Sequence, residues 1–184
     1  MMNTFLDGDS LALRAITMED ASEEYLSWLN DPETTKGLET GKFPQTMDQL
    51  ESYISAMMAD RGVIMLAIIE KSSGRHIGNI KLHNFDWISR TGELGILIGN
   101  KSVWGKGYGH ESCKLIVAYA FDRLNLRKVW LAVYANNPAA IHIYQKLGFE
   151  EEGKLKAHVF SGAAYVDKIF MGLFAQDYAS KNKA

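Results

Sequence analysis

The residues best suited to binding chemistry form a glycine-rich stretch in the middle of the chain. Gly105, Gly107 and Gly109 stand at alternate positions, between an apolar run at 96–98 and a segment with helical periodicity. Glycines let a backbone approach a ligand closely, and a helix start offers unpaired N–H groups with a partial positive charge. A strand, a glycine loop and a helix in this order are typical of a phosphate or pyrophosphate site. The alternative is a flexible connection whose glycines only make a turn.

The surroundings of this loop narrow the kind of phosphate site. Lys101, Lys106 and Lys114 place positive charge nearby. No Lys-Ser or Lys-Thr follows the glycines, so the loop is not a Walker loop. The glycine spacing and the mid-chain position also fit a dinucleotide fingerprint poorly.

Few other side chains in the sequence are suited to chemistry. Cys113, the one cysteine, lies on an apolar helical stripe, which favours core packing over a nucleophilic role and excludes a disulfide within the chain. Tyr144 could donate a proton, because a phenol with a pKa of about 10 stays protonated at neutral pH. Its alternative is a core aromatic on a helix face. The five histidines show no metal-ligand spacing, so we predict no metal, and His142 is interpreted as structural.

Hydrophobic periodicity and capping residues predict the elements that position these groups. Thr17 and Asp20 suggest a helix start, and Asn137 followed by Pro138 suggests another, ended by Gly148. The expected strands are 11–15, 63–70, 77–85, 93–98, 129–135, 149–153 and 166–174, and the expected helices follow Thr17 and span 46–59, 109–124 and 138–147. This order predicts an α/β (α+β) fold with helices packed on one mixed sheet, and no linker or repeat divides residues 1–184 into more than one domain.

Two motifs resemble those of the GNAT superfamily of N-acetyltransferases. The family's Arg/Gln-x-x-Gly-x-Gly/Ala motif is similar to residues 104–109, where Gly107 and Gly109 hold the small-residue positions and Trp104 stands in place of Arg or Gln. Residues 137–149 match its Asn-x-x-Ala-x-x-x-Tyr-x-x-x-Gly-Phe pattern. The chain most resembles the ribosomal-protein N-terminal and spermidine acetyltransferase subgroup.

The resemblance implies a fold and a cofactor. The fold is a mixed, mostly antiparallel sheet of about seven strands, splayed between the fourth and fifth strands. The co-substrate is acetyl-CoA, whose pantetheine arm would pair with main-chain groups of the fourth strand. The residues implied in cofactor binding are Ile96, Leu97, Ile98, Trp104, Gly105, Lys106, Gly107, Tyr108, Gly109 and Asn137. Asn137 is equally explained by its role as an N-cap.

The resemblance also implies a reaction, the direct transfer of an acetyl group to a primary amine. A main-chain N–H at Leu97 or Ile98 would stabilise the oxyanion, and Tyr144 would protonate the leaving thiolate. Glu93 is the expected general base, with a solvated charge at the strand end as the alternative. Two competing functions are a non-catalytic acyl-CoA-binding or regulatory domain and a protein that binds another nucleotide phosphate.

The acceptor is the least defined part of this prediction. Six acidic and two basic residues between positions 30 and 60 favour a cationic amine, but residues 34–41 lack the paired glutamates of the spermidine enzymes. A polyamine, a protein N-terminus and a nucleotide-linked amino sugar stay open, bound by the loops 30–45, 84–91 and 157–165. A net charge of −2 indicates neither a nucleic-acid nor a membrane partner. One cysteine and no apparent secretory signal favour a cytoplasmic location, and homo-oligomerisation stays open.

Overall fold

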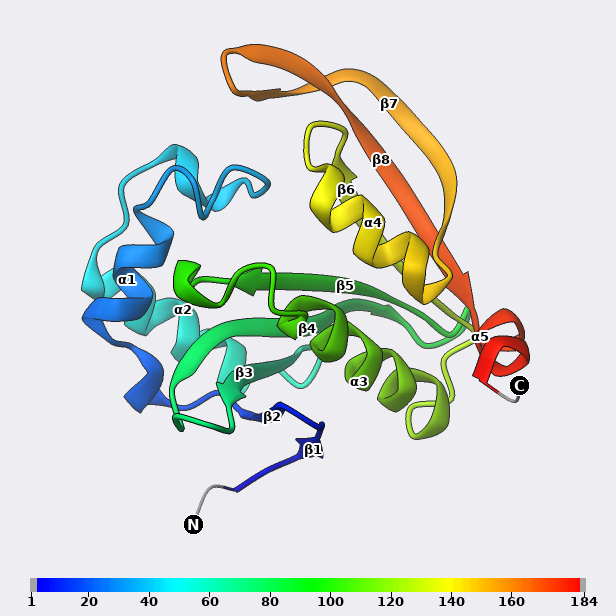
Figure 1. The fold of residues 1–184 in the computed structure, drawn as a ribbon, viewed down its shortest axis with the longest axis horizontal. Coiled ribbons are helices and arrows are strands. Elements are labelled where there is room, and N and C mark those ends of the chain that lie inside the picture. Colours follow the sequence, from blue (N-terminus) through cyan, green and yellow to red (C-terminus); the bar gives the residue numbers. More distant parts are fainter. Residues whose placement is uncertain (1–2, 183–184) are drawn as a thin grey trace.

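One eight-stranded sheet runs through the protein, in the order β1-β2-β3-β4-β5-β6-β8-β7 (Figure 1). The computed structural model describes residues 3–182. The strands are β1 Leu6–Asp7, β2 Leu11–Ala15, β3 Ile64–Glu70, β4 His76–Asp86, β5 Thr91–Ile98, β6 Lys128–Tyr134, β7 Glu150–Ser161 and β8 Ala164–Phe174. All neighbours are antiparallel except β5 and β6, which are parallel. The predicted mixed, mostly antiparallel sheet is confirmed, with β1 as an additional strand.

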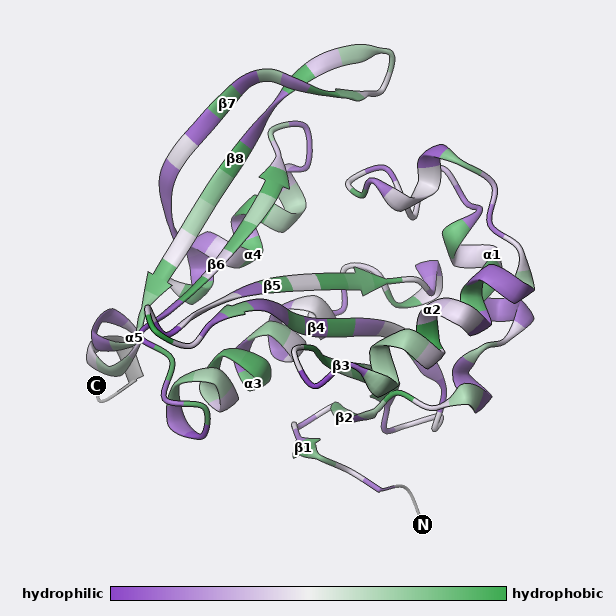
Figure 2. Ribbon diagram, turned by 180° about the vertical axis from the view of Figure 1, so that it is seen from behind, coloured by the Kyte–Doolittle hydropathy of each residue, from purple (hydrophilic) through white to green (hydrophobic). Residues whose placement is uncertain are grey.

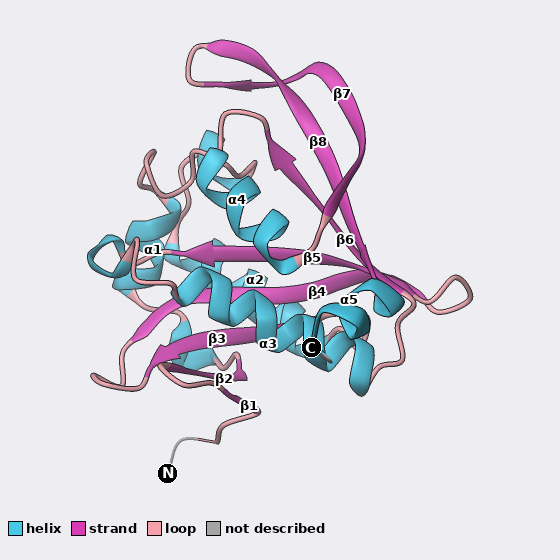
Figure 3. Ribbon diagram, turned by 45° about the vertical axis from the view of Figure 1, so that its right-hand side comes forward, coloured by secondary structure: helices cyan, strands magenta, loops and turns pink. Residues whose placement is uncertain are grey.

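Helices cover both faces of this sheet (Figure 3). They are α1 Glu23–Leu29, α2 Met47–Ala59, α3 Tyr108–Asp122, α4 Pro138–Leu147 and α5 Ala175–Asn182. Side chains alternate along β3, so Leu66 and Ile68 join the core that includes α3, whereas Met65 and Ile69 join the core under α1 and α2. Figure 2 shows the apolar stretches of β4 and β5 between these layers. None of the helices within residues 3–182 combines the length and apolar character needed to cross a bilayer.

The sheet opens between β5 and β6. The two strands pair only where residues 91–93 lie beside residues 128–130. Beyond Glu93, β5 continues to Ile98, and β6 runs on to Tyr134 while pairing with β8 on its other edge. The predicted splay between the fourth and fifth expected strands is therefore confirmed, and α4 follows directly from the free end of β6.

The first predicted helix is wrong in its start. Thr17 precedes only a short 3-10 turn, Met18–Asp20, and α1 begins after Ser22, whose hydroxyl accepts a hydrogen bond from the Tyr25 N–H. The Asp20 carboxylate turns back to the Thr17 N–H at 2.8 Å and to Arg14 at 2.6 Å. These contacts fix a separate turn at the end of β2. The sequence was interpreted as one helix after Thr17, whereas the structure has a 3-10 turn followed by α1.

The last two strands are longer than predicted, and the expected loop at 157–165 is wrong. β7 and β8 pair up to Ser161 and Ala164, and only Gly162 and Ala163 form the turn, both with positive φ. Two residues of this conformation make a tight hairpin turn. A register shift between Leu155 and Val159 interrupts the period-2 pattern, which is why the strand is hard to recognise in the sequence. The helix α5 was not predicted either.

Candidate active site

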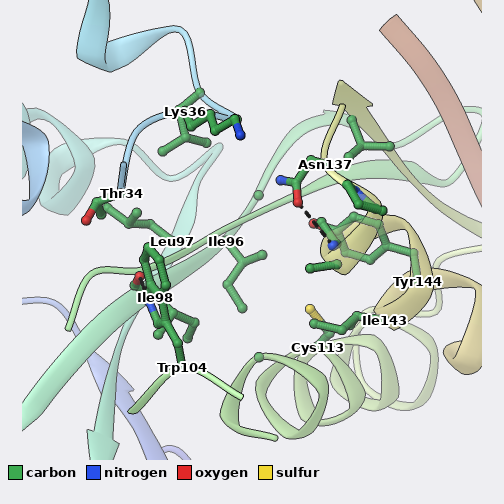
Figure 4. A pocket seen from close by; sticks show the side chains of 18 of the residues that line it. Thr34, Lys36, Ile96, Leu97, Ile98, Trp104, Cys113, Asn137, Ile143 and Tyr144 are labelled. Carbon is green, nitrogen blue, oxygen red and sulfur yellow. Dashed lines mark hydrogen bonds between the residues drawn. The ribbon is translucent and has the colours of Figure 1, made fainter. Parts of the chain in front are cut away.

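A cavity of about 480 Å³ fills the split between β5 and β6 (Figure 4). Its walls come from β5, the start of α3, β6, α4 and the segment 33–38. Seven of the predicted site residues line it: Ile96, Leu97, Ile98, Trp104, Gly109, Asn137 and Tyr144. The structure therefore brings together residues from both sequence motifs around one space.

The register of β4 and β5 decides which main-chain groups face this cavity. The Gly99 N–H donates to the Ile77 carbonyl oxygen at 2.9 Å, so the hydrogen-bonded pairs of this antiparallel ladder include Asn79 with Leu97. The main-chain groups of Ile96 and Ile98 point the other way, to the edge that β6 leaves unpaired. Of the three residues predicted to contact the cofactor, Ile96 and Ile98 direct their main-chain groups to the edge that β6 leaves unpaired, whereas those of Leu97 are used within the sheet.

Trp104 connects the glycine loop to this strand. Its indole Nε1 donates a hydrogen bond to the Ile98 carbonyl oxygen at 2.9 Å. Trp104 stands at the position where the GNAT motif has Arg or Gln, and this hydrogen bond gives the tryptophan a structural role there. The indole fixes the loop to the end of β5 and occupies one of the acceptors on its free edge.

The loop glycines are required by their backbone conformation. Gly105 and Gly107 have φ values of 76° and 89°, which other residues adopt only at a cost, and a Cβ on either would meet nothing within 4 Å. Gly107 is the N-cap of α3, whose first hydrogen bond runs from the Glu111 N–H to the Gly107 carbonyl oxygen. In residues 3–182, no group accepts a hydrogen bond from the N–H of Tyr108 or Gly109. This open surface with free amides fits a phosphate group.

The side chain of Tyr108 anchors the loop from behind instead of lining the cavity. Its hydroxyl donates to Glu70 Oε1 at 2.8 Å, and Glu70 also binds Ser73 and Arg75. Hydrogen bonds from Ser73, Tyr108 and Arg75 lower the pKa of Glu70 to about 2, so the carboxylate stays ionised. The turn between β3 and β4 thereby holds the first residue of α3 in place.

The lysines near the loop differ in their availability. Lys101 Nζ lies 2.6 Å from Asp31 Oδ2 and 3.0 Å from Glu33 Oε2, so its charge is already matched. Lys106 is exposed at the loop surface and forms no ion pair within the described part of the chain. Of these two lysines, only Lys106 has a charge available to a bound diphosphate.

Tyr144 lies inside the cavity, on α4. Its side chain is 7% exposed, and within residues 3–182 its hydroxyl has no hydrogen-bond partner. Burial, and then the nearby Cys113, raise the pKa of Tyr144 above that of a free tyrosine, so the phenol is protonated. Burial also raises the pKa of the fully buried Cys113 to about 12, which keeps the thiol neutral.

Asn137 and Glu93 lie in different surroundings. Asn137 Oδ1 accepts from the Ala140 N–H at 3.2 Å as the N-cap of α4, and its Nδ2 points toward Gly37 across the cavity. Glu93 lies on the other face of β5, where it accepts from Asn84 Nδ2 at 2.6 Å. Glu93 lines neither this cavity nor the second one described next, so the structure does not bring it to Tyr144.

A second cavity, of about 310 Å³, lies on the α1 and α2 side of β5. It shares Leu38, Gly95, Ile96 and Leu97 with the first cavity. Its other walls come from α1, β3, β4, α2 and the segment before α2, through residues that include Tyr25, Gln45, Gln49, Tyr53 and Lys81. Tyr25 and Tyr53 lie on α1 and α2, and nothing in the sequence marked them as lining a site.

A sheet opened between two parallel strands, with a free strand edge and an amide-lined glycine loop beside it, defines an acyltransferase that uses coenzyme A thioesters. Residues 10–150 match the family described as Acetyltransferase (GNAT) domain, and the chain belongs to this family. It is an N-acetyltransferase with acetyl-CoA as its co-substrate, which confirms the predicted family, fold and cofactor.

Individual relatives agree with this assignment. The chain is 26% identical over 179 residues to an SPbeta prophage-derived uncharacterized N-acetyltransferase of Bacillus subtilis (strain 168), covering 97% of each protein. It is 35% identical over 115 residues to spermidine N(1)-acetyltransferase of Escherichia coli (strain K12), covering 62% of this chain and 61% of that enzyme. The crystal structure of spermidine N-acetyltransferase from Vibrio cholerae in complex with CoA and spermine superposes with a TM-score of 0.83, at 27% identity, covering 92% of this chain and 98% of the other.

Proposed function

We propose that the protein transfers acetyl directly from acetyl-CoA to a primary amine that approaches from the opposite side of β5. The observation that supports this most is the meeting of the two cavities at residues 95–97. We call the first cavity the cofactor cavity and the second the acceptor cavity. A thioester in the cofactor cavity and an amine in the acceptor cavity would come within reach of each other at this point, so no acyl-enzyme is needed. The residues around both cavities would then take part in one reaction at β5.

The tetrahedral intermediate needs a hydrogen-bond donor on the free edge of β5. The Ile98 and Ile96 N–H groups point to that edge, so we assign the oxyanion to one of them and no longer to Leu97. Such a donor contributes about 2.7–4 kcal/mol in other enzymes. The remaining free groups of the same edge would pair with the amides of the pantetheine arm.

Tyr144 is the proposed general acid toward the leaving thiolate. Its hydroxyl is buried at the cavity wall, and its raised pKa keeps the proton in place until a thiolate forms. The raised pKa also makes it a weaker acid. The proton therefore moves only as the C–S bond breaks and the sulfur gains charge.

Glu93 is the proposed general base toward the amine. This carboxylate lies on the acceptor side of β5, and its Oε2 is 4.0 Å from His83 Nδ1. Because Glu93 does not line the acceptor cavity, it would take the proton of the amine through water. The same side of the sheet thus holds the acceptor and the group that deprotonates it.

The similarity to spermidine N(1)-acetyltransferase supports a small-molecule amine as the acceptor. The test is thiol release from acetyl-CoA over a panel of polyamines, amino sugars and peptides with free N-termini. Turnover on at least one amine, with formation of its N-acetyl product, is expected. Tight coenzyme A binding with no turnover on any amine would favour the alternative of a non-catalytic acyl-CoA-binding domain.

A further inference from the structure

Lys81 has no partner in the acceptor cavity. It lies on β4, paired in register with Gly95 of β5, and it lines the cavity beside the point where the two cavities meet. A Cβ on Gly95 would stand 3.3 Å from Lys81 Cε, so the lysine chain crosses β5 where that strand has no side chain. Within residues 3–182, Lys81 Nζ makes no hydrogen bond and no ion pair.

The carboxylate closest in register to Lys81 is already engaged. Glu93 lies two residues along β5 from Gly95, and its negative charge favours the protonated form of Lys81. Its Oε2, however, accepts a hydrogen bond from Asn84 at 2.6 Å. Burial is the larger influence and lowers the pKa of Lys81. A half-buried ammonium without a direct counter-ion is costly, and a bound anion would remove that cost.

The rest of the acceptor cavity does not suit a polycation. Only one of its lining residues, Glu39, is acidic. Its Oε1 lies 3.3 Å from Lys168 Nζ, and its side chain is 70% exposed, so it is directed to the outside. Asp31 and Glu33, which contribute to the acidic excess of residues 30–60, bind Lys101 on the cofactor side. Three of the acidic residues that suggested a cationic acceptor, Asp31, Glu33 and Glu39, are therefore paired with lysines of the protein.

Lys81 also borders a third hollow, of about 420 Å³, which none of the residues of the cofactor cavity line. Its lining includes His83, Asn84 and Trp87. Asp60, its only acidic residue, accepts a hydrogen bond from the Gly62 N–H at 2.7 Å. An acceptor longer than the acceptor cavity has room here, with Lys81 at the junction between its two parts.

We propose that Lys81 binds an anionic group, a carboxylate or a phosphate, on the amine that this enzyme acetylates. The inference rests on the proposed function and defines its substrate class. The acceptor is then a primary amine with a negative charge several bonds from its nitrogen, and a polyamine is disfavoured because it adds positive charge beside Lys81. Lys81 is a specificity-determining residue in this scheme.

The experiment compares matched amines with and without the anion. The carboxylate pair is 4-aminobutyrate and butylamine, the phosphate pair is phosphoethanolamine and ethanolamine, and spermidine represents the polycations. The kcat/KM of the wild-type enzyme should favour the anionic member of at least one pair by about 10- to 100-fold, as expected for a charge-assisted contact. The pair with the larger ratio identifies the anion.

Variants of Lys81 assign the preference to this side chain. Lys81→Met should abolish the ratio, Lys81→Arg should retain most of it, and Lys81→Glu should shift the preference to spermidine. Lys156→Met is the matched control, since Lys156 is exposed on β7 and lines none of the three hollows. Unchanged melting temperature and coenzyme A affinity would show that each variant is folded.

Two results would overturn the inference while leaving the proposed function intact. One is a wild-type enzyme that uses butylamine, ethanolamine or spermidine at least as well as both anionic amines. The other is a Lys81→Met variant with an unchanged ratio. If no amine is turned over, the proposed function fails, and calorimetry on the enzyme–coenzyme A complex decides on Lys81: binding of an anionic amine that Lys81→Met loses supports it, and absent or unchanged binding rejects it.

Discussion

Replacing Tyr144 by phenylalanine separates catalysis from stability in this protein. The hydroxyl is buried and has no hydrogen-bond partner within residues 3–182, so its removal breaks no hydrogen bond of the free enzyme. An apolar replacement of the same shape then costs about 1 kcal/mol of folding stability or less. We therefore expect Tyr144→Phe to unfold at nearly the wild-type temperature and to bind coenzyme A with nearly the wild-type affinity.

The expected kinetic loss is much larger. General acid catalysis contributes roughly 10²- to 10⁴-fold, which corresponds to about 3–5 kcal/mol of the barrier. Burial raises the pKa of Tyr144, and the required form is the protonated one, which persists below that pKa. The wild-type kcat should consequently lack a tyrosine-dependent decrease as the pH passes about 10, the value of a free phenol.

Single-turnover measurements of thiol release would test both expectations, because they report the chemical step. Tyr134→Phe is the matched control, since Tyr134 is also buried, its hydroxyl has no partner in the described residues, and it does not line the cofactor cavity. The reasoning is refuted if Tyr144→Phe retains the wild-type rate of the chemical step, or if Tyr134→Phe loses as much.

Three further predictions concern the loop and the sheet. Gly107→Ala should lower the free energy of unfolding by about 1–2 kcal/mol because φ is 89°, and should weaken coenzyme A binding in calorimetry, whereas Gly153→Ala should do neither. The pKa of Glu70 is lowered to about 2, so its ionised carboxylate contributes fully to folding stability above pH about 4.3, the pKa of a free glutamate, and this contribution is lost as the pH falls toward 2. Glu70→Gln should therefore flatten the pH dependence of the free energy of unfolding in that range. In hydrogen exchange, the Leu97 amide should be protected in the free protein, while that of Ile98 should become protected only when coenzyme A is added; equal protection of both without cofactor would contradict the proposed use of the free edge.

The elements around the proposed cofactor site could be predicted because they depend on local sequence. The glycines at 105 and 107 have positive φ, and Asn137 followed by Pro138 is a typical helix start that begins α4 here. Both signals act over a few residues, so their spacing along the chain is preserved in the structure. The resemblance to the GNAT family then indicated which strands lie on either side of the split.

The acceptor half depends on contacts between distant segments, which the sequence does not reveal. Tyr25 and Lys81 line one cavity although they lie on α1 and β4, and their neighbours in the chain show ordinary core periodicity. Leu97 illustrates a second limit. Its place next to Ile98 in the sequence suggested an equal role, but only the register with β4 shows that its main-chain groups are already paired.

The alternation of a single strand accounts for the place where we propose that the acetyl donor and the amine meet. In β5, the main-chain groups of Ile96 and Ile98 face the split, while position 95 belongs to the set of residues whose side chains would point to the α2 side. That position is glycine, so no side chain separates the acceptor cavity from the main chain that would hold the thioester. A larger residue there would displace Lys81 and close the route, because even a Cβ would stand 3.3 Å from its Cε. The proposed reaction geometry thus depends on the free edge of β5 and on the missing side chain of Gly95 together.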